Sequence, residues 1–198
     1  RERARETMSA TPAKINLLGM SHNMLQDFFA ERGEKPFRAR QVLQWIHQRY
    51  VTDFDEMTDL SKKLREQLQS DCEIVLPQVQ SRHESSDGTV KWLFATDCGQ
   101  AVETVFIPEP GRGTLCISSQ VGCALDCAFC ATGAQGFNRN LTSAEIIGQV
   151  FVANNELPRR DNGDPAVTNV VFMGMGEPLA NYRNVVPALD LLISDWSY

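Results

Sequence analysis

The sequence predicts an α/β protein in which a small helical domain and an antiparallel β-hairpin sheet precede the first βα units of a parallel sheet. Three observations lead to this fold class. Apolar residues recur at helical spacing in the first third, strand-like runs separated by Asp87-Gly88 and Cys98-Gly99 follow, and strands then alternate with helices. We therefore expect a helical domain over residues 1–72, an antiparallel extension over 73–112 and a parallel α/β part over 113–198.

The first segment has the capping residues and apolar spacing of three helices. Ser21 caps a helix to about Ala30, Pro36 stands just before a helix over residues 37–50, and Ser61 caps the third. The residues at helical spacing are expected to form the buried faces. They are Met24, Leu25, Phe28, Phe29, Val42, Leu43, Trp45, Ile46, Leu64 and Leu68.

The middle segment has the composition of an antiparallel sheet. Residues 74–80, 89–95 and 101–107 are rich in Val, Ile, Phe and Thr, with partial alternation and turn signals between them. We expect this sheet to end in a connection over residues 108–113, before a further strand at 114–118.

The last segment alternates strands and helices. Thr142 and Glu145 form a capping box for a helix to about Asn155, and residues 167–173 are apolar enough for a strand buried on both faces. A helix from about Asn184 then has Pro187 in its first turn. Two βα units are too few to complete such a sheet, so we expect this sequence to be truncated at its C-terminus.

Nothing in the sequence points to a membrane. No apolar run approaches the roughly 20 residues that span a bilayer, and residues 1–10 lack the apolar stretch of a signal peptide. We expect a cytoplasmic monomer whose thiols stay reduced, so that clustered cysteines indicate a metal site or catalysis.

Three cysteines stand within eight residues, at Cys123, Cys127 and Cys130, in a loop after a predicted parallel strand. Thiolates at this spacing can meet at one centre, and sulfur ligands suit an iron–sulfur cluster or zinc. A structural zinc site needs a fourth ligand, for which Cys116 is nearest in sequence. A thioredoxin-like motif would use Cys127 and Cys130 alone, and three incidental buried cysteines are the alternative without chemistry.

A second motif, Gly174-Met175-Gly176-Glu177-Pro178, follows the next predicted parallel strand. Glycines at the carboxyl end of a strand let the backbone approach a ligand closely, and ligands of α/β folds bind at that edge. A carboxylate there could hold an ammonium group. The alternative is a plain helix-entry turn with a capping glutamate.

With Phe129 before its last cysteine, the three-cysteine motif resembles that of the radical S-adenosylmethionine superfamily. The resemblance implies a partial (β/α) barrel and a [4Fe–4S] cluster held by Cys123, Cys127 and Cys130, with S-adenosylmethionine on its open iron. It further implies that Phe129 and residues 174–178 contact S-adenosylmethionine, whose amino group meets Gly176 and Glu177.

Longer motifs resemble one family of this superfamily, the RNA methyltransferases that modify carbon 2 of adenosine in large-subunit rRNA and in tRNA. The motifs are residues 37–41, 102–108, 114–123, 129–133 and 174–178, and the resemblance extends from about residue 15 to 198. It implies rRNA and tRNA as substrates and a reducing partner such as flavodoxin. It also implies a methyl-carrying cysteine in a C-terminal part that this sequence lacks.

The resemblance assigns roles to two further residues. Glu103 corresponds to the proton acceptor, and Cys116 to the cysteine that resolves the protein–RNA adduct by forming a transient disulfide. Without the resemblance, Cys116 would be a small buried residue of its strand and Glu103 a solvated one. Cys72 and Cys98 match no motif of the family.

The charge distribution supports RNA contact in the first segment alone. The net charge is −6, but residues 1–70 carry 12 Lys and Arg against 10 Asp and Glu, whereas residues 71–198 carry 7 against 15. Five cations around the second predicted helix face a single acid, Glu34, which favours phosphate binding; a solvated helix face is the alternative. The five are Arg32, Lys35, Arg38, Arg40 and Arg49.

Three other functions stay open on the sequence alone. The first is a related radical enzyme that methylates carbon 8 of adenosine with the same cluster. The second is a non-catalytic RNA-binding fragment stabilised by zinc or a cluster. The third is a radical enzyme that acts on a protein or a small molecule, which would leave the basic helix unexplained.

Overall fold

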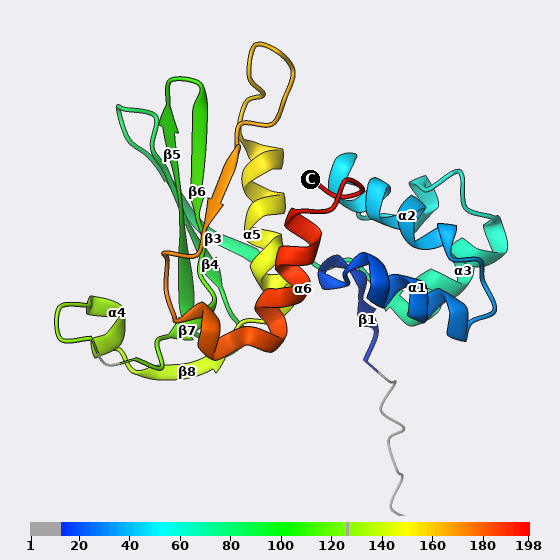
Figure 1. Ribbon diagram of the computed structural model, residues 1–198, viewed down its shortest axis with the longest axis horizontal. Coiled ribbons are helices and arrows are strands. Elements are labelled where there is room, and N and C mark those ends of the chain that lie inside the picture. Colours follow the sequence, from blue (N-terminus) through cyan, green and yellow to red (C-terminus); the bar gives the residue numbers. More distant parts are fainter. Residues whose placement is uncertain (1–12, 126) are drawn as a thin grey trace, which may run out of the picture.

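The computed structural model describes residues 13–125 and 127–198. It contains a five-stranded sheet and a separate group of short helices, with two longer helices between them (Figure 1). The longer helices are α5 (Ser143–Glu156) and α6 (Tyr182–Leu192). Among the described residues, no helix is both long enough and apolar enough to cross a bilayer.

The helical unit forms as its capping signals predict. Ser21 and Ser61 accept hydrogen bonds from the backbone three residues on, at the starts of α1 (His22–Glu31) and α3 (Lys62–Asp71). The predicted helix over residues 37–50 consists of α2 (Phe37–Leu43) and a π-helical stretch that ends at Gln48. The unit is closed by the short parallel pair β1 (Ile15–Asn16) and β2 (Cys72–Glu73).

The sheet has the order β3-β4-β5-β6-β9, and every neighbouring pair is antiparallel except β6 and β9. The strands are β3 (Gln78–Glu84), β4 (Val90–Ala95), β5 (Ala101–Glu109), β6 (Arg112–Cys116) and β9 (Asn169–Val171). The first strand begins four residues later than the predicted 74–80, just after Pro77, which has no N–H to donate to a ladder.

The predicted connection over residues 108–113 is wrong, because β5 and β6 form one hairpin that turns at residues 110 and 111. Pro108 is tolerated within β5 since β4 pairs with this strand only as far as Phe106. The sheet is therefore continuous from the antiparallel segment into the parallel one, and the expected boundary at 112/113 falls inside this hairpin.

The two faces of the sheet differ. Val90, Trp92, Phe94, Phe106 and Leu115 are buried in the core on the face that α5 and α6 cover. No helix of the described residues lies over the opposite face (Figure 1). The prediction that residues 167–173 are buried on both faces is accordingly wrong, since β9 is a half-buried edge strand and Met173 is 80% exposed.

The two βα connections run along one face of the sheet. Thr142 and Glu145 form the predicted capping box of α5, in which each side chain bonds the backbone of the other residue. Helix α6 begins at Tyr182, directly after a 3₁₀ turn over Pro178–Asn181. Pro187 therefore lies inside the helix, and its predicted place in the first turn is wrong.

The helical unit packs directly against α5. Gly19, in a 3₁₀ turn, lies against the first turn of α5, where the Ser143 hydroxyl donates to the Gly19 carbonyl at 2.8 Å. The rings of Tyr50 and Phe151 meet edge to face at 5.1 Å. These contacts fix the helical unit on the side of α5 away from the sheet.

Candidate functional site

The cysteine loop and the glycine-rich loop meet at one edge of the sheet, because each follows one of the two parallel strands, β6 and β9. The backbone N–H of Ser119 donates to the Met175 carbonyl at 2.8 Å, and the N–H of Gly174 donates to the Ile117 carbonyl at 3.1 Å. The parallel ladder thus continues beyond the strands and joins the segment that leads into the cysteine loop to the start of the glycine-rich loop.

The glycines of the second loop are required by this close approach. A methyl group on Gly174 would lie 2.7 Å from the Ile117 carbonyl oxygen and from the Ser118 hydroxyl. Gly176 has a φ of +93°, and a methyl group there would lie 2.4 Å from the β-carbon of Gln120. The glycines therefore keep the backbone of one loop against the other.

Buried polar side chains beneath the loops hold them together. The Ser118 hydroxyl donates to the Glu103 carbonyl at 2.6 Å and accepts from the Met175 N–H at 2.9 Å. Gln149 of α5 accepts from the Ser118 N–H at 2.8 Å, and Asn181 donates to the Ser119 carbonyl at 2.8 Å. Sequence reasoning missed these residues, and the available signal was a polar run, Ser118-Ser119-Gln120, directly after an apolar strand.

The cysteine loop leaves and re-enters the fold through a short antiparallel pair, β7 (Gln120–Gly122) and β8 (Phe137–Asn140). The Cys123 N–H donates to the Gly136 carbonyl at 3.2 Å, which closes the loop at its base. Gly122 has a φ of +74°, and a methyl group on it would lie 1.8 Å from the same oxygen. These contacts fix the base of the loop, and α4 (Ala131–Ala134) begins just after its last cysteine.

The three predicted cluster ligands lie on this one loop. Cys127 is exposed, Cys123 and Cys130 are half-buried, and Phe129 is 94% exposed. Within the described ranges, no three His, Cys, Asp or Glu side chains stand close enough together to hold a metal ion. The structure thus places the thiols on a common loop without bringing them to one point.

The donor set nevertheless fits an iron–sulfur cluster. Thiolates are the ligands of such clusters, and the backbone N–H groups of Gly133 and Thr132 hold the pKa of the Cys130 thiol below its ordinary value. Three thiols on an exposed loop form a set that leaves a fourth position free for another ligand.

Glu177, the predicted ligand for an amino group, stands at the entry to the helix that follows. Its carboxylate accepts from the Leu179 N–H at 3.0 Å. Glu177 therefore caps the 3₁₀ turn that follows it, as the alternative interpretation of this motif expected. Its own N–H donates to the side chain of Gln120 at 3.0 Å. The residue is half-buried and lies on the loop that meets the cysteine loop.

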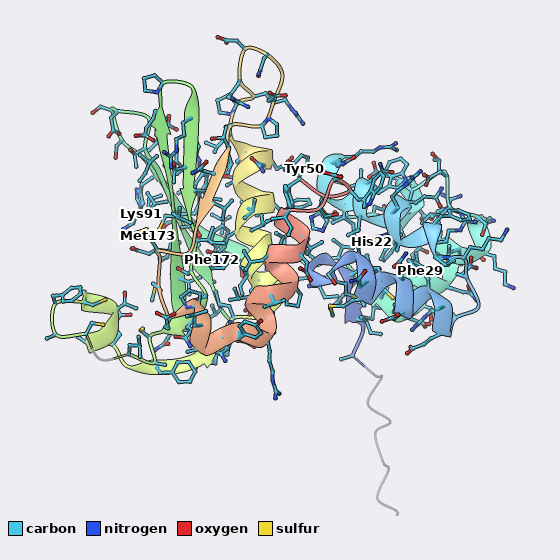
Figure 2. All side chains as sticks on the ribbon, in the orientation of Figure 1. His22, Phe29, Tyr50, Lys91, Phe172 and Met173 are labelled. Carbon is cyan, nitrogen blue, oxygen red and sulfur yellow. The ribbon has the colours of Figure 1, made fainter. Side chains whose placement is uncertain are left out.

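Glu103 and Cys116 share the uncovered face of the sheet. Cys116 pairs with Val105, and Glu103 lies two residues from Val105 on the same strand, a diagonal neighbour at roughly 7–8 Å. The carboxylate of Glu103 forms an ion pair with Lys91 of β4 at 2.6 Å. Figure 2 shows Lys91 and Met173 on this face, whereas Phe172 lies toward the helices. The two predicted catalytic residues therefore border the same space.

The six cysteines are all free thiols, in different surroundings. Burial raises the pKa of the Cys116 thiol, which the Met173 N–H partly offsets. Burial also raises the pKa of Cys72 to about 11, as expected of a structural residue, whereas the Thr96 hydroxyl lowers the pKa of the exposed Cys98.

The predicted basic residues do not form a uniform surface. Arg38 is 19% exposed and is held by Glu34, Gln41 and the Asp59 carbonyl. Arg40 and Arg49 are exposed, and their guanidinium groups lie over the rings of Trp196 and Trp45 at 4.7 Å and 4.1 Å. Arg32 and Lys35 are exposed as well.

Comparison with known proteins gives a family match for the first segment and similar proteins for nearly the whole chain. Residues 15–74 match the family model of the ribosomal RNA large subunit methyltransferase N-terminal domain. A protein of Marinobacter nauticus named dual-specificity RNA methyltransferase RlmN is 57% identical over 191 residues, which is 96% of this chain and 52% of the relative. One of the same name from Alkalilimnicola ehrlichii is 58% identical over 184 residues, or 93% of this chain and 50% of the relative.

The fold has a counterpart among solved structures. A radical SAM methyltransferase from Sphaerobacter thermophilus superposes with a TM-score of 0.79 at 38% identity, over 92% of this chain and 53% of that one. The predicted α/β fold and the resemblance stated from the motifs are thereby confirmed. The chain spans about half the length of the curated relatives it matches. It belongs to the RlmN family of radical S-adenosylmethionine methyltransferases.

Proposed function

We propose that this chain is the part of an RNA adenosine methyltransferase that binds a [4Fe–4S] cluster and S-adenosylmethionine. The observation that carries the proposal is the junction at the carboxyl ends of β6 and β9, where backbone hydrogen bonds join residues 117–120, which lead into the cysteine loop, to the glycine-rich loop. A ligand held by both loops would lie beside the uncovered face that carries Glu103 and Cys116.

Each loop has a distinct task in this proposal. The thiolates of Cys123, Cys127 and Cys130 hold the cluster, and the second loop, residues 174–178, receives the amino acid part of S-adenosylmethionine. Glu177 supplies the charge for its ammonium group, and Phe129 covers it at the tip of the cysteine loop. When bound, the cluster supplies the electron that reductively cleaves S-adenosylmethionine.

The uncovered face contributes the acid–base and thiol chemistry of the proposed methylation at carbon 2 of adenosine. Glu103, paired with Lys91 at 2.6 Å, accepts a proton from the substrate base. Burial raises the pKa of the Cys116 thiol, so Cys116 must lose its proton before its thiolate can attack the sulfur of the adduct. Its disulfide partner would be a cysteine outside this chain.

The substrates and partners belong to the proposal as well. We infer that rRNA and tRNA are the substrates, that a reducing partner such as flavodoxin supplies electrons, and that the protein works as a cytoplasmic monomer. The names of the relatives and the exposed arginines of the helical unit support RNA contact.

Reductive cleavage without methyl transfer is the first test. We expect the reconstituted chain, given dithionite and S-adenosylmethionine, to form 5′-deoxyadenosine. It should leave adenosine in RNA unmethylated, because the two cysteines without a role in the proposal, Cys72 and Cys98, match no motif of the family. Mass spectrometry of the small molecules and of digested RNA gives both results. Failure to form 5′-deoxyadenosine with a full cluster, or the appearance of methylated RNA, would contradict this division of tasks.

The contribution of the basic helix to RNA binding is a second test. We expect the double change Arg40→Ala and Arg49→Ala to weaken binding of a tRNA anticodon stem-loop about tenfold and to lower the salt slope by about two. Lys62→Ala and Lys63→Ala on α3 provide a control that removes the same charge elsewhere. Filter binding at several salt concentrations measures both, and equal losses in the two variants would show that the charge acts non-specifically.

A further inference from the structure

We propose that Gln120 is a positioning residue that couples the cysteine loop to the glycine-rich loop, so that ligands held by the two loops keep a fixed separation. The coupling itself concerns this chain's own residues. Its consequence for S-adenosylmethionine rests on the function proposed above.

The amide of Gln120 contacts both loops with one oxygen atom. Its Oε1 accepts from the N–H of Ala124, next to the first cysteine, at 3.2 Å, and from the N–H of Glu177 at 3.0 Å. Its Nε2 donates to Oδ1 of Asn140 on β8 at 2.8 Å. A single side chain therefore holds the start of the cysteine loop, the strand that ends it and the carboxylate-bearing residue of the other loop.

The surroundings leave this side chain little freedom. Gln120 is 1% exposed, and a methyl group at Gly176 would lie 2.4 Å from its β-carbon, so the glycine-rich loop packs directly on it. Asn140 itself is oriented by the strand pair β7–β8, in which it stands opposite Gln120. Because both N–H groups bind the same oxygen, a displacement of one loop is transmitted to the other.

The chemistry selects glutamine at this position. An acceptor is needed toward two backbone N–H groups and a donor toward Asn140, and only an amide supplies both at this length. Methionine has nearly the same shape but would leave the two N–H groups without a partner. Glutamate keeps the acceptor oxygen, and Asn140 can turn its own amide to donate to the second carboxylate oxygen.

Amide exchange in the chain without cluster tests the coupling. In Gln120→Met we expect the N–H groups of Ala124 and Glu177 both to exchange with solvent at least about tenfold faster than in the unchanged chain, as measured by NMR. In Gln120→Glu both N–H groups should remain protected. Tyr198→Phe, which removes the 3.0 Å hydrogen bond between the tyrosine hydroxyl and Nδ1 of the buried His47, is the control for general destabilisation and should leave both amides unchanged. Faster exchange of one amide alone, or equal acceleration in the control, would overturn the proposal.

Two further measurements complete the test. If Gln120→Met does not fold, Asn140→Ala removes the anchor of Nε2 and should accelerate both amides together; no change at either would overturn the coupling. After anaerobic reconstitution, the methionine variant should retain its iron but bind S-adenosylmethionine at least about tenfold more weakly, in an EPR titration that Gln120→Glu restores. A wild-type chain that binds no cluster would refute the proposed function, whereas the exchange result would still decide the role of Gln120.

Discussion

Replacing Cys127 by alanine is expected to lower the iron bound after anaerobic reconstitution from about four atoms per chain to less than about one. The residue is exposed at the middle of a loop that places three thiols within eight residues, and a cluster that loses one of three protein ligands has two anchors left. Iron and sulfide analysis of the desalted protein measures the effect.

The control for this change is Cys98→Ala, at an exposed cysteine in the turn between β4 and β5. It should bind as much iron as the unchanged chain, because it lies outside the loop. Full iron content in Cys127→Ala would show that the loop is not the ligand set. Zinc in place of iron would favour the metal-stabilised fragment over the radical enzyme.

Replacing Gly19 by valine is expected to reduce the free energy of unfolding by about 3 kcal/mol or more. A methyl group at this position would lie 2.2 Å from the nitrogen of Ala144 and 2.7 Å from its α-carbon, and both are backbone atoms of α5 that no rotamer change moves. The helical unit would have to shift away from the helix that supports the candidate site. Urea denaturation followed by circular dichroism measures the loss.

The matched control is Ala30→Val on the exposed side of α1, in the same unit. This change adds two carbon atoms, where Gly19→Val adds three, at an exposed position, and should cost less than about 1 kcal/mol, mainly in helix propensity. A loss at Gly19 no larger than at Ala30 would mean that the close contact with α5 does not support the fold.

Capping residues in the sequence were sufficient to predict where three of the helices begin. Ser21, Ser61 and the Thr142–Glu145 box start helices in the structure where the capping pattern predicted them. The hairpin between β5 and β6 was missed because Pro108 and Pro110 suggested a break. Pro108 is accommodated by a non-local feature, the end of β4 at the level of Phe106, which no local pattern records.

The sequence predicted the residues of the candidate site, but not the buried polar side chains that hold its loops together. Alternation along β5 and β6 places Glu103 and Cys116 on one face once the register is known, and the register depends on the hairpin turn. Ser118, Gln120 and Gln149 form hydrogen bonds between residues 31 and 57 positions apart, which periodicity cannot reveal. The hydrogen bond from Arg38 to the Asp59 carbonyl could not be predicted for the same reason, since the two residues lie on separate segments.

The measurement that tests the central claim most directly is EPR spectroscopy of the reduced, reconstituted chain before and after addition of S-adenosylmethionine. We predict the signal of a reduced [4Fe–4S] cluster whose shape changes when S-adenosylmethionine binds at the open iron beside the glycine-rich loop. A well-formed cluster whose spectrum S-adenosylmethionine leaves unchanged would contradict the claim that the two loops form one site.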